Sequence, residues 1–255
     1  MKAFTNTPIT KEKFIQHLKK HKEMDAFEKG HYGQGFEMGD ENFKGCAVGC
    51  SLRSVALELG INIDTGKHVH YEKYLGVPEW LARVEDRIFE GLPLSRAKRW
   101  PIEFGEAINK GAELDKVKAP FLIFVLESCF EYVQDKKFKQ QREGLERVVK
   151  LWQREDLYSD EWLEDAHANA DNAADAHANA AATARTARAA AYVAYYAATA
   201  RADAYASAYA ADNAADARAA AAYAAAATTD ASYAARAAAY DKFADKLLEL
   251  IRECK

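Results

Sequence analysis

The distribution of glycine and proline constrains the fold of this 255-residue chain more than any other feature. All five prolines, and every glycine except Gly144, lie before Phe121. These residues interrupt regular structure most strongly, so the first half is predicted to hold several short elements and loops, and the second half to be helical. We place the boundary after residue 143, which gives an N-terminal domain of residues 1–143 and a C-terminal domain of residues 144–255.

Alanine accounts for more than half of residues 165–240. It has the highest helix propensity of all residues, so this stretch is predicted to be helical. One straight helix would span about 110 Å and would have nothing to pack against. We therefore expect an antiparallel bundle of three or four alanine-rich helices, with corners where Asp, Asn and Thr favour turns. The predicted corners are Asp171-Asn172, Asp212-Asn213 and Thr228-Thr229-Asp230.

The N-terminal domain is also predicted to be mostly helical. Apolar residues recur at helical spacing in five segments, which are residues 9–28, 51–59, 77–90, 101–109 and 120–134. Thr10 is the expected N-cap of the first segment, and Gly60 is the expected residue that ends the second. Residues 30–49 are rich in glycine and are predicted to form a small hairpin with its tip at residues 39–42. The predicted fold class is therefore all-α, with one small glycine-rich hairpin.

Charge and hydropathy exclude several classes of protein. The net charge of −4 gives no general attraction to nucleic acid. No run of apolar residues is long enough for a transmembrane helix. The lysines near the N-terminus are not followed by the apolar stretch of a secretory signal, and four cysteines are too few for a disulfide scaffold. We therefore expect a protein of the cytoplasm that binds neither nucleic acid nor membranes.

The large residues of the alanine-rich region are almost all tyrosines, and arginines are interleaved with them. In one interpretation, the tyrosines fill gaps between helices and the arginines are solvated. In the other, both line a cavity that stacks and pairs a planar anion such as a nucleotide. The second interpretation predicts a set of ligand-binding residues without any cofactor. These are Arg185, Arg188, Tyr192, Tyr196, Arg201, Tyr205, Tyr209 and Arg218.

Two cysteines and two histidines lie close together in the sequence. Cys46 and Cys50 precede or begin a predicted helix, and His68 and His70 follow it. They could form a Cys₂His₂ zinc site, although their spacing is not that of a zinc finger. A cysteine near a helix N-terminus could also be an activated thiolate with histidine as its base. The remaining interpretation, small buried residues at a tight corner, is the one we favour, so no metal or catalytic residue is assigned.

Carboxylates are concentrated in the segment predicted to be a helix over residues 77–90. Glu85, Asp86 and Glu90 lie there beside Arg83 and Arg87. Their spacing favours ion pairs on a helix surface over a catalytic pair of carboxylates. No known catalytic motif is present, and an enzyme is not expected.

Three stretches resemble a group of uncharacterised proteins from bacteriophages and bacteria. They are residues 45–52 (GCAVGCSL), 71–80 (YEKYLGVPEW) and 85–93 (EDRIFEGLP). The alanine-rich tail, in which Trp162 is followed by alanine pairs and tyrosines, is similar to helical immunity proteins of bacterial polymorphic-toxin systems. Neither resemblance carries a catalytic residue over to this chain.

The resemblance implies a role in conflict between phages and bacteria. We expect a non-catalytic, homo-oligomeric anti-defence protein that sequesters a small anionic immune signal of nucleotide type in a pocket lined by Tyr and Arg. Its compartment would be the host cytoplasm if a phage encodes it. One alternative is an immunity protein that binds a protein toxin. Another is an enzyme or zinc protein that depends on Cys and His.

Overall fold

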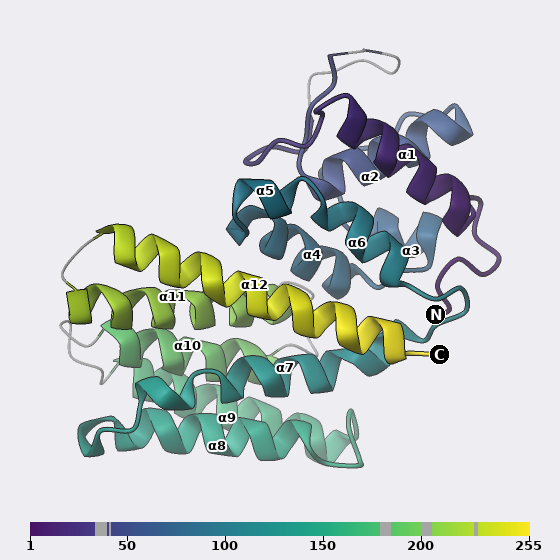
Figure 1. Ribbon diagram of the computed structural model, residues 1–255. Helices are drawn as coiled ribbons and strands as arrows, with labels where there is room; N and C mark the ends of the chain where they lie inside the picture. Colours follow the sequence, from purple (N-terminus) through teal and green to yellow (C-terminus); the bar gives the residue numbers. More distant parts are fainter. Residues whose placement is uncertain (34–39, 41, 179–184, 200–205, 227–228) are drawn as a thin grey trace. The chain divides into compact units, whose positions relative to one another are not determined.

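The computed structural model describes residues 1–33, 40, 42–178, 185–199, 206–226 and 229–255, and the secondary structure in these ranges is helical, with loops between the helices (Figure 1). No β-strand occurs in these ranges, and Phe27 and Gly45 form one isolated bridge. Of the predicted hairpin tip at residues 39–42, residues 39 and 41 lie outside the described ranges. The fold class predicted from the sequence is confirmed.

Two compact units make up the chain. Unit 1 contains Met1–Val117 and Leu247–Lys255, and unit 2 contains Lys118–Lys246. The predicted boundary after residue 143 therefore lies inside unit 2. The last helix, α12 (Thr229–Glu253), contributes its first part to unit 2 and its last turns to unit 1.

Unit 1 is built from short helices around a core of large side chains. Its helices before the C-terminal segment are α1 (Lys11–Glu23), α2 (Ala47–Leu59), α3 (His70–Leu75), α4 (Glu79–Gly91), α5 (Leu94–Ala97), α6 (Trp100–Ala107) and the 3-10 helix η1 (Leu114–Val117). Thr10 Oγ1 accepts the N–H of Lys13, and Gly60 ends α2 in the left-handed conformation, so both predicted caps are confirmed. The core contains Tyr71 and Trp100, which are fully buried.

The start of α2 differs from the prediction. The helix begins at Ala47, four residues before the predicted start, and Cys46 is its N-cap. Cys46 Sγ accepts the N–H of Gly49 at 3.4 Å. Gly49 itself lies against the backbone of Tyr32, where an added Cβ would be 2.6 Å from the Tyr32 carbonyl oxygen. Glycine at this position therefore allows the loop that carries Tyr32 to lie directly on α2.

Unit 2 is the alanine-rich bundle together with the helices that precede it. These are α7 (Lys118–Glu127), η2 (Phe130–Tyr132), η3 (Lys136–Phe138), α8 (Lys139–Trp152), α9 (Asp160–Ala178), α10 (Arg185–Thr199), α11 (Ala206–Ala226) and the first part of α12. Figure 1 shows α8, α9, α10 and α11 running side by side, and α10 packs against α8, α9 and α11. Because short segments join α9, α10 and α11, successive helices are antiparallel, as predicted.

Two of the three predicted corners are wrong. Asp171-Asn172 lies within α9, and Asp212-Asn213 lies within α11. The amides of Asn172 and Asn213 each donate to the carbonyl four residues earlier, at 2.8 Å, so these side chains bond within the helix instead of turning the chain. At the third corner, α11 ends at Ala226 and α12 begins at Thr229, while Thr228 lies outside the described residues.

Close packing of α10 depends on the small size of alanine. Ala197 is fully buried, and its carbonyl oxygen accepts the indole N–H of Trp152 at 2.9 Å. Trp162 donates in the same way to the carbonyl of Leu151, and its ring contacts that of Trp152 at 5.0 Å. Alanine leaves the helix backbone accessible to a neighbouring indole, so a few large residues hold the alanine helices in place.

Candidate functional site

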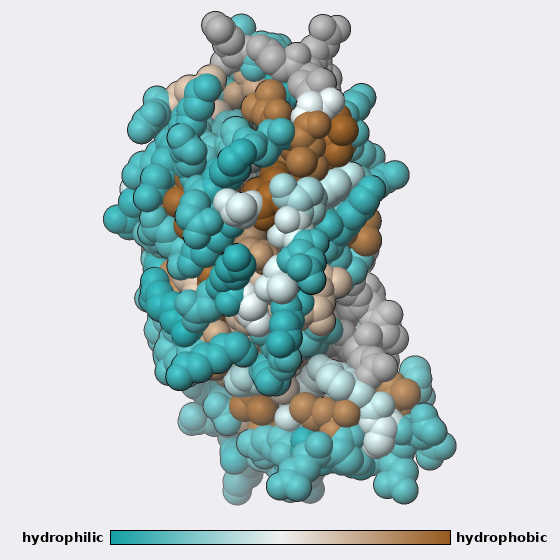
Figure 2. All heavy atoms as spheres, turned by 90° about the vertical axis from the view of Figure 1, so that its right-hand side faces the viewer, coloured by the Kyte–Doolittle hydropathy of each residue, from teal (hydrophilic) through white to brown (hydrophobic). Residues whose placement is uncertain are grey.

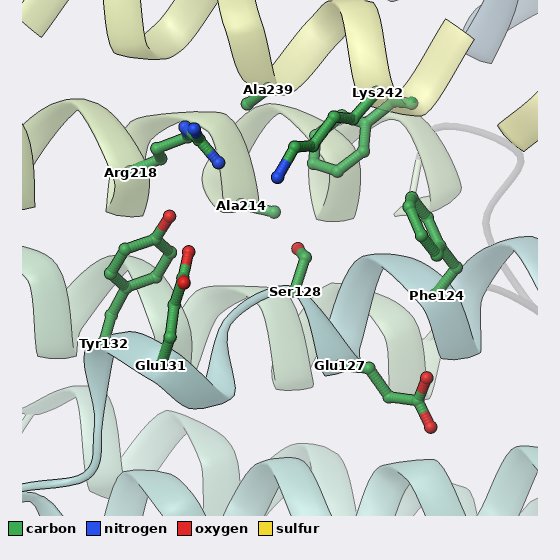
Figure 3. Close-up of a pocket in the computed structure, with 10 residues that line it drawn as sticks. Phe124, Glu127, Ser128, Glu131, Tyr132, Ala214, Arg218, Ala239 and Lys242 are labelled. Atoms are coloured by element: carbon green, nitrogen blue, oxygen red, sulfur yellow. The ribbon is translucent and has the colours of Figure 1, made fainter. Parts of the chain in front are cut away.

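A pocket of about 470 Å³ opens in unit 2 between the end of α7, η2, α11 and α12 (Figure 3). This volume falls within the range of small-molecule sites. Apolar, aromatic, polar and charged side chains all contribute to it. The lining residues are Phe124, Glu127, Ser128, Glu131, Tyr132, Ala214, Arg218, Ala239, Lys242 and Phe243.

Small residues on two helices create the space. Ala214 on α11 and Ala239 on α12 present only methyl groups to the pocket. Phe124 and Phe243 meet edge to face at 6.3 Å and form an apolar wall. The pocket is therefore a place where bulky residues of α7 and α12 face the alanine surface of α11.

Two cations line this pocket without ion pairs. Neither Arg218 nor Lys242 forms an ion pair or a hydrogen bond with any residue that the structure describes. In Figure 3, Arg218 lies above the hydroxyl of Tyr132, and the amine of Lys242 points into the space above Ser128. Both groups are thus available to an anion.

The two carboxylates of the lining differ in their orientation. Figure 3 shows Glu131 beside Tyr132 and Glu127 pointing away from the other lining side chains. Burial, and then Glu131, raise the pKa of Tyr132 above its usual value. The Tyr132 hydroxyl therefore keeps its proton at neutral pH and is directed toward the neighbouring Glu131 carboxylate.

Only part of the predicted Tyr/Arg set can be placed by side chain. Arg218 lines the pocket, while the rings of Tyr196 and Tyr209 contact each other at 5.0 Å between α10 and α11. The remaining five residues contribute no described side chain. Arg185, Arg188 and Tyr192 belong to α10 by their backbone, and Arg201 and Tyr205 lie outside the described residues.

Another arginine of the alanine-rich region has a structural role. Arg236 on α12 forms ion pairs with Asp212 and Asp216 on α11. Tyr240 donates its hydroxyl to the same Asp212 carboxylate at 2.5 Å. This group ties α11 to α12 and is not available to a ligand.

The sequence did not predict the other pocket residues. Lys242 is one of many charged residues in the amphipathic end of the last helix, and Tyr132 lies in a segment predicted to be core helix. That segment ends as α7 at Glu127, and η2 follows. The break places Ser128 and Tyr132 at the pocket. The only sign of this helix break in the sequence is that the apolar run of residues 121–126 gives way to the polar pair Glu127-Ser128.

In unit 1, the four metal or thiol candidates do not form one group. Cys50 Sγ donates to the carbonyls of Ala26 and Gly45, at 3.6 and 3.4 Å, and the His70 ring contacts Tyr74 at 5.7 Å. Cys46 and His68 belong to a different group. They lie around the carboxylate of Asp86.

The Asp86 group lies in a shielded part of unit 1 between α2, α4 and the loop before α2. Asp86 Oδ2 accepts the hydroxyl of Tyr32 at 2.9 Å and lies 3.3 Å from His68 Nε2. Glu90, one turn later on α4, accepts the N–H of Gly30 at 3.0 Å. Cys46, at 1% exposure, lies beside both carboxylates.

These positions correct one expectation from the sequence. Glu85, Asp86 and Glu90 were expected to form surface ion pairs, and the structure shows otherwise. Glu85 is 1% exposed and accepts the hydroxyl of Tyr71 at 2.7 Å. Asp86 and Glu90 are partly buried. One helix thus carries three carboxylates toward the interior of unit 1.

Comparisons of the chain with protein-family models, curated proteins and solved structures find no match. None of the described helices combines the length and the apolar composition that a membrane span requires. On the face drawn in Figure 2, hydrophilic residues cover most of the area, and hydrophobic residues form separate patches. Functional inference therefore rests on the pocket of unit 2 and the Asp86 group of unit 1.

Proposed function

We propose that this chain is a non-catalytic binding protein that holds a small, planar anion of nucleotide type in the pocket of unit 2. The observation that carries the proposal is the pair of cations without ion pairs, Arg218 and Lys242, in a pocket with aromatic walls. A pocket of about 470 Å³ accommodates a ligand of that size.

The charged groups favour an anion. Arg218 offers a planar fork of donors that suits phosphate or carboxylate, and Lys242 offers a point charge nearby. Glu127 points away from the other lining residues, so Glu131 is the one lining carboxylate that faces a negative ligand (Figure 3). Tyr132 adds a neutral hydroxyl to the lining of the same pocket.

The aromatic groups favour a planar ligand. Phe124, Phe243 and Tyr132 supply apolar faces and edges, and Ala214 and Ala239 leave room beside them. Stacking of a base on such side chains contributes about 1–3 kcal/mol and tolerates different bases. A nucleotide would use both ends of the pocket, whereas inorganic phosphate or a free nucleoside would use only one.

The hydroxyl groups favour binding without turnover. The Ser128 hydroxyl donates to the carbonyl of Val125 at 2.6 Å, so its proton is held by the backbone of α7. Tyr132 is held in its protonated form. A pocket of this kind would retain a ligand intact, which is the behaviour of a protein that acts by sequestration.

The resemblance to phage and bacterial proteins supplies the proposed biological setting. In that setting, the ligand is an immune signal of nucleotide type, and the chain lowers its free concentration. Homo-oligomer formation and residence in the host cytoplasm remain predictions. The alternative of a protein toxin as partner has no specific support in the pocket.

The test uses the purified full-length chain and isothermal titration with AMP, cyclic AMP and ADP-ribose. Adenosine, without the anion, and inorganic phosphate, without the ring, are the matched ligand controls. We expect at least one nucleotide to bind once per chain and more tightly than either control. Arg218→Ala or Lys242→Ala should weaken that binding roughly 10- to 100-fold, the loss expected for a charge-assisted hydrogen bond.

Two further variants show whether the loss is specific to the pocket. Arg142→Ala and Lys150→Ala remove exposed cations of α8 that do not line the pocket, and both should bind like the wild type. Bound nucleotide should be recovered chemically unchanged after denaturation of the protein. The proposal fails if no nucleotide of the panel binds, if the pocket variants bind normally, or if the nucleotide is converted.

A further inference from the structure

We propose that unit 1 contains a binding site for a divalent transition-metal ion, best suited to Zn²⁺, with Cys46, Asp86 and Glu90 as its ligands. Sγ of Cys46 and one carboxylate oxygen from each acidic residue all lie within 4.8 Å of one another. Tetrahedral zinc with bonds of about 2.0–2.3 Å holds its ligand atoms about 3.3–3.7 Å apart, so the three side chains would move toward one another by about 1 Å on binding.

One oxygen of the Asp86 carboxylate has no hydrogen bond among the described residues. This oxygen, Oδ1, is shielded from solvent. A buried carboxylate oxygen without a partner is costly, and a bound cation removes that cost. The other oxygen, Oδ2, is already held by Tyr32 and by His68.

The contacts of Oδ2 resemble the outer shell of a metal site. Arg83 lies 3.4 Å from His68 Nδ1 and can only donate, so His68 carries its hydrogen on Nε2 and donates it to Asp86. Tyr32 donates to the same oxygen. Outer-shell donors of this kind fix the orientation of a ligating carboxylate. Glu90 is oriented similarly by the N–H of Gly30.

The local charge also favours a cation. Asp86 and Glu90 place two carboxylates beside the Cys46 thiol. A bound divalent ion would offset their negative charge, with the thiol proton released to solvent.

The donor set distinguishes among metals. Mg²⁺ and Ca²⁺ take oxygen ligands, whereas a thiolate with two carboxylates suits Zn²⁺ or a related transition metal. Three protein ligands leave a fourth position, which a water molecule would fill. This set differs from the Cys₂His₂ set considered from the sequence, since Cys50 and His70 have other contacts and His68 acts through Asp86.

The test measures metal binding directly on the reduced, metal-free, full-length protein. Co²⁺ is added as a spectroscopic probe, and Zn²⁺ is then titrated against a chromophoric chelator. We expect one ion per chain, with a sulfur-to-cobalt charge-transfer band that Zn²⁺ abolishes. Cys46→Ser should remove the band, and Glu90→Gln should strongly weaken Zn²⁺ binding. Tyr32→Phe should weaken it by about 10- to 100-fold through the outer shell.

Matched controls separate loss of a ligand from loss of the fold. Cys50→Ser and His70→Ala alter the other two candidates and should leave the band and the stoichiometry unchanged. Circular dichroism of each metal-free variant verifies that it is folded, and Glu90→Gln decides the matter if Cys46→Ser does not fold. Absence of stoichiometric binding, a spectrum without sulfur coordination, or normal binding by folded Cys46→Ser or Glu90→Gln would overturn the proposal. The site lies in unit 1, so this outcome is independent of nucleotide binding in unit 2.

Discussion

The carboxyl group of Glu85 should make the stability of this protein fall as the pH rises from acid to neutral. Glu85 lies on α4 at 1% exposure and accepts the hydroxyl of Tyr71 at 2.7 Å. Burial raises its pKa from 4.5 to about 8; the hydrogen bond from Tyr71 opposes this shift, and Asp86 adds to it. The native state therefore holds a proton at neutral pH that the unfolded chain releases.

The sign and size of the effect follow from proton linkage. A group whose pKa is raised by folding stabilises the native state fully below its unfolded pKa of 4.5, and this contribution disappears as the pH rises through about 8. Each pKa unit corresponds to about 1.36 kcal/mol, so a shift from 4.5 to about 8 amounts to about 5 kcal/mol in total. Of this, about 4 kcal/mol should be lost between pH 5 and pH 8.

Urea unfolding, followed by tryptophan fluorescence at several pH values, measures this loss. Glu85→Gln keeps an oxygen for Tyr71 and has no charge to titrate. The free energy of unfolding of the wild type, minus that of the variant, should therefore fall by about 4 kcal/mol from pH 5 to pH 8. The same difference for Gln16→Ala, which alters an exposed residue of α1 that carries no titratable group, should stay constant. A wild-type minus Glu85→Gln difference independent of pH would show that Glu85 is ionised in the folded protein and would refute the reasoning.

Three further substitutions test the packing that positions the two sites. Gly49→Ala places a Cβ 2.6 Å from the carbonyl oxygen of Tyr32, so it should destabilise the protein by about 1–3 kcal/mol in urea unfolding. Trp152→Phe leaves the carbonyl of Ala197 without its indole donor, and the melting temperature should fall in line with a loss of about 1–3 kcal/mol. Ala214→Leu fills the pocket of unit 2, so nucleotide affinity in isothermal titration should fall at least roughly tenfold while circular dichroism shows an intact fold.

Much of the fold could be predicted from the sequence because its strongest signals are local. Alanine propensity, together with the absence of glycine and proline, predicts a helical tail, and the structure confirms it. The corners of that tail were harder to predict. Asn172 and Asn213 can end a helix or bond within it, and nothing local distinguishes the two. Tertiary packing selects the second outcome at both positions.

The Asp86 group shows a different limit of prediction. Cys46 and His68 were singled out by residue type, but Asp86 and Glu90 were assigned to surface ion pairs. The two carboxylates lie four residues apart and so share one face of α4. A sequence shows that they share a face, but it does not show whether that face meets solvent or α2. Only the packing of α2 against α4 makes them neighbours of Cys46.

The pocket of unit 2 could not be located from the sequence for a related reason. α11 is rich in alanine on every side, so its sequence does not distinguish a buried face from an exposed one. The position of a cavity along such a helix is set by its neighbours: Phe124 and Phe243 fill the space at one end, and Tyr132 lies at the other. The alanine residues of α11 therefore leave room for a ligand. The bulkier helices around α11 determine where that room lies and which charged side chains reach it. Arg218 was predicted because it belongs to the alanine-rich segment, and Lys242 was missed because its role depends on what lies opposite.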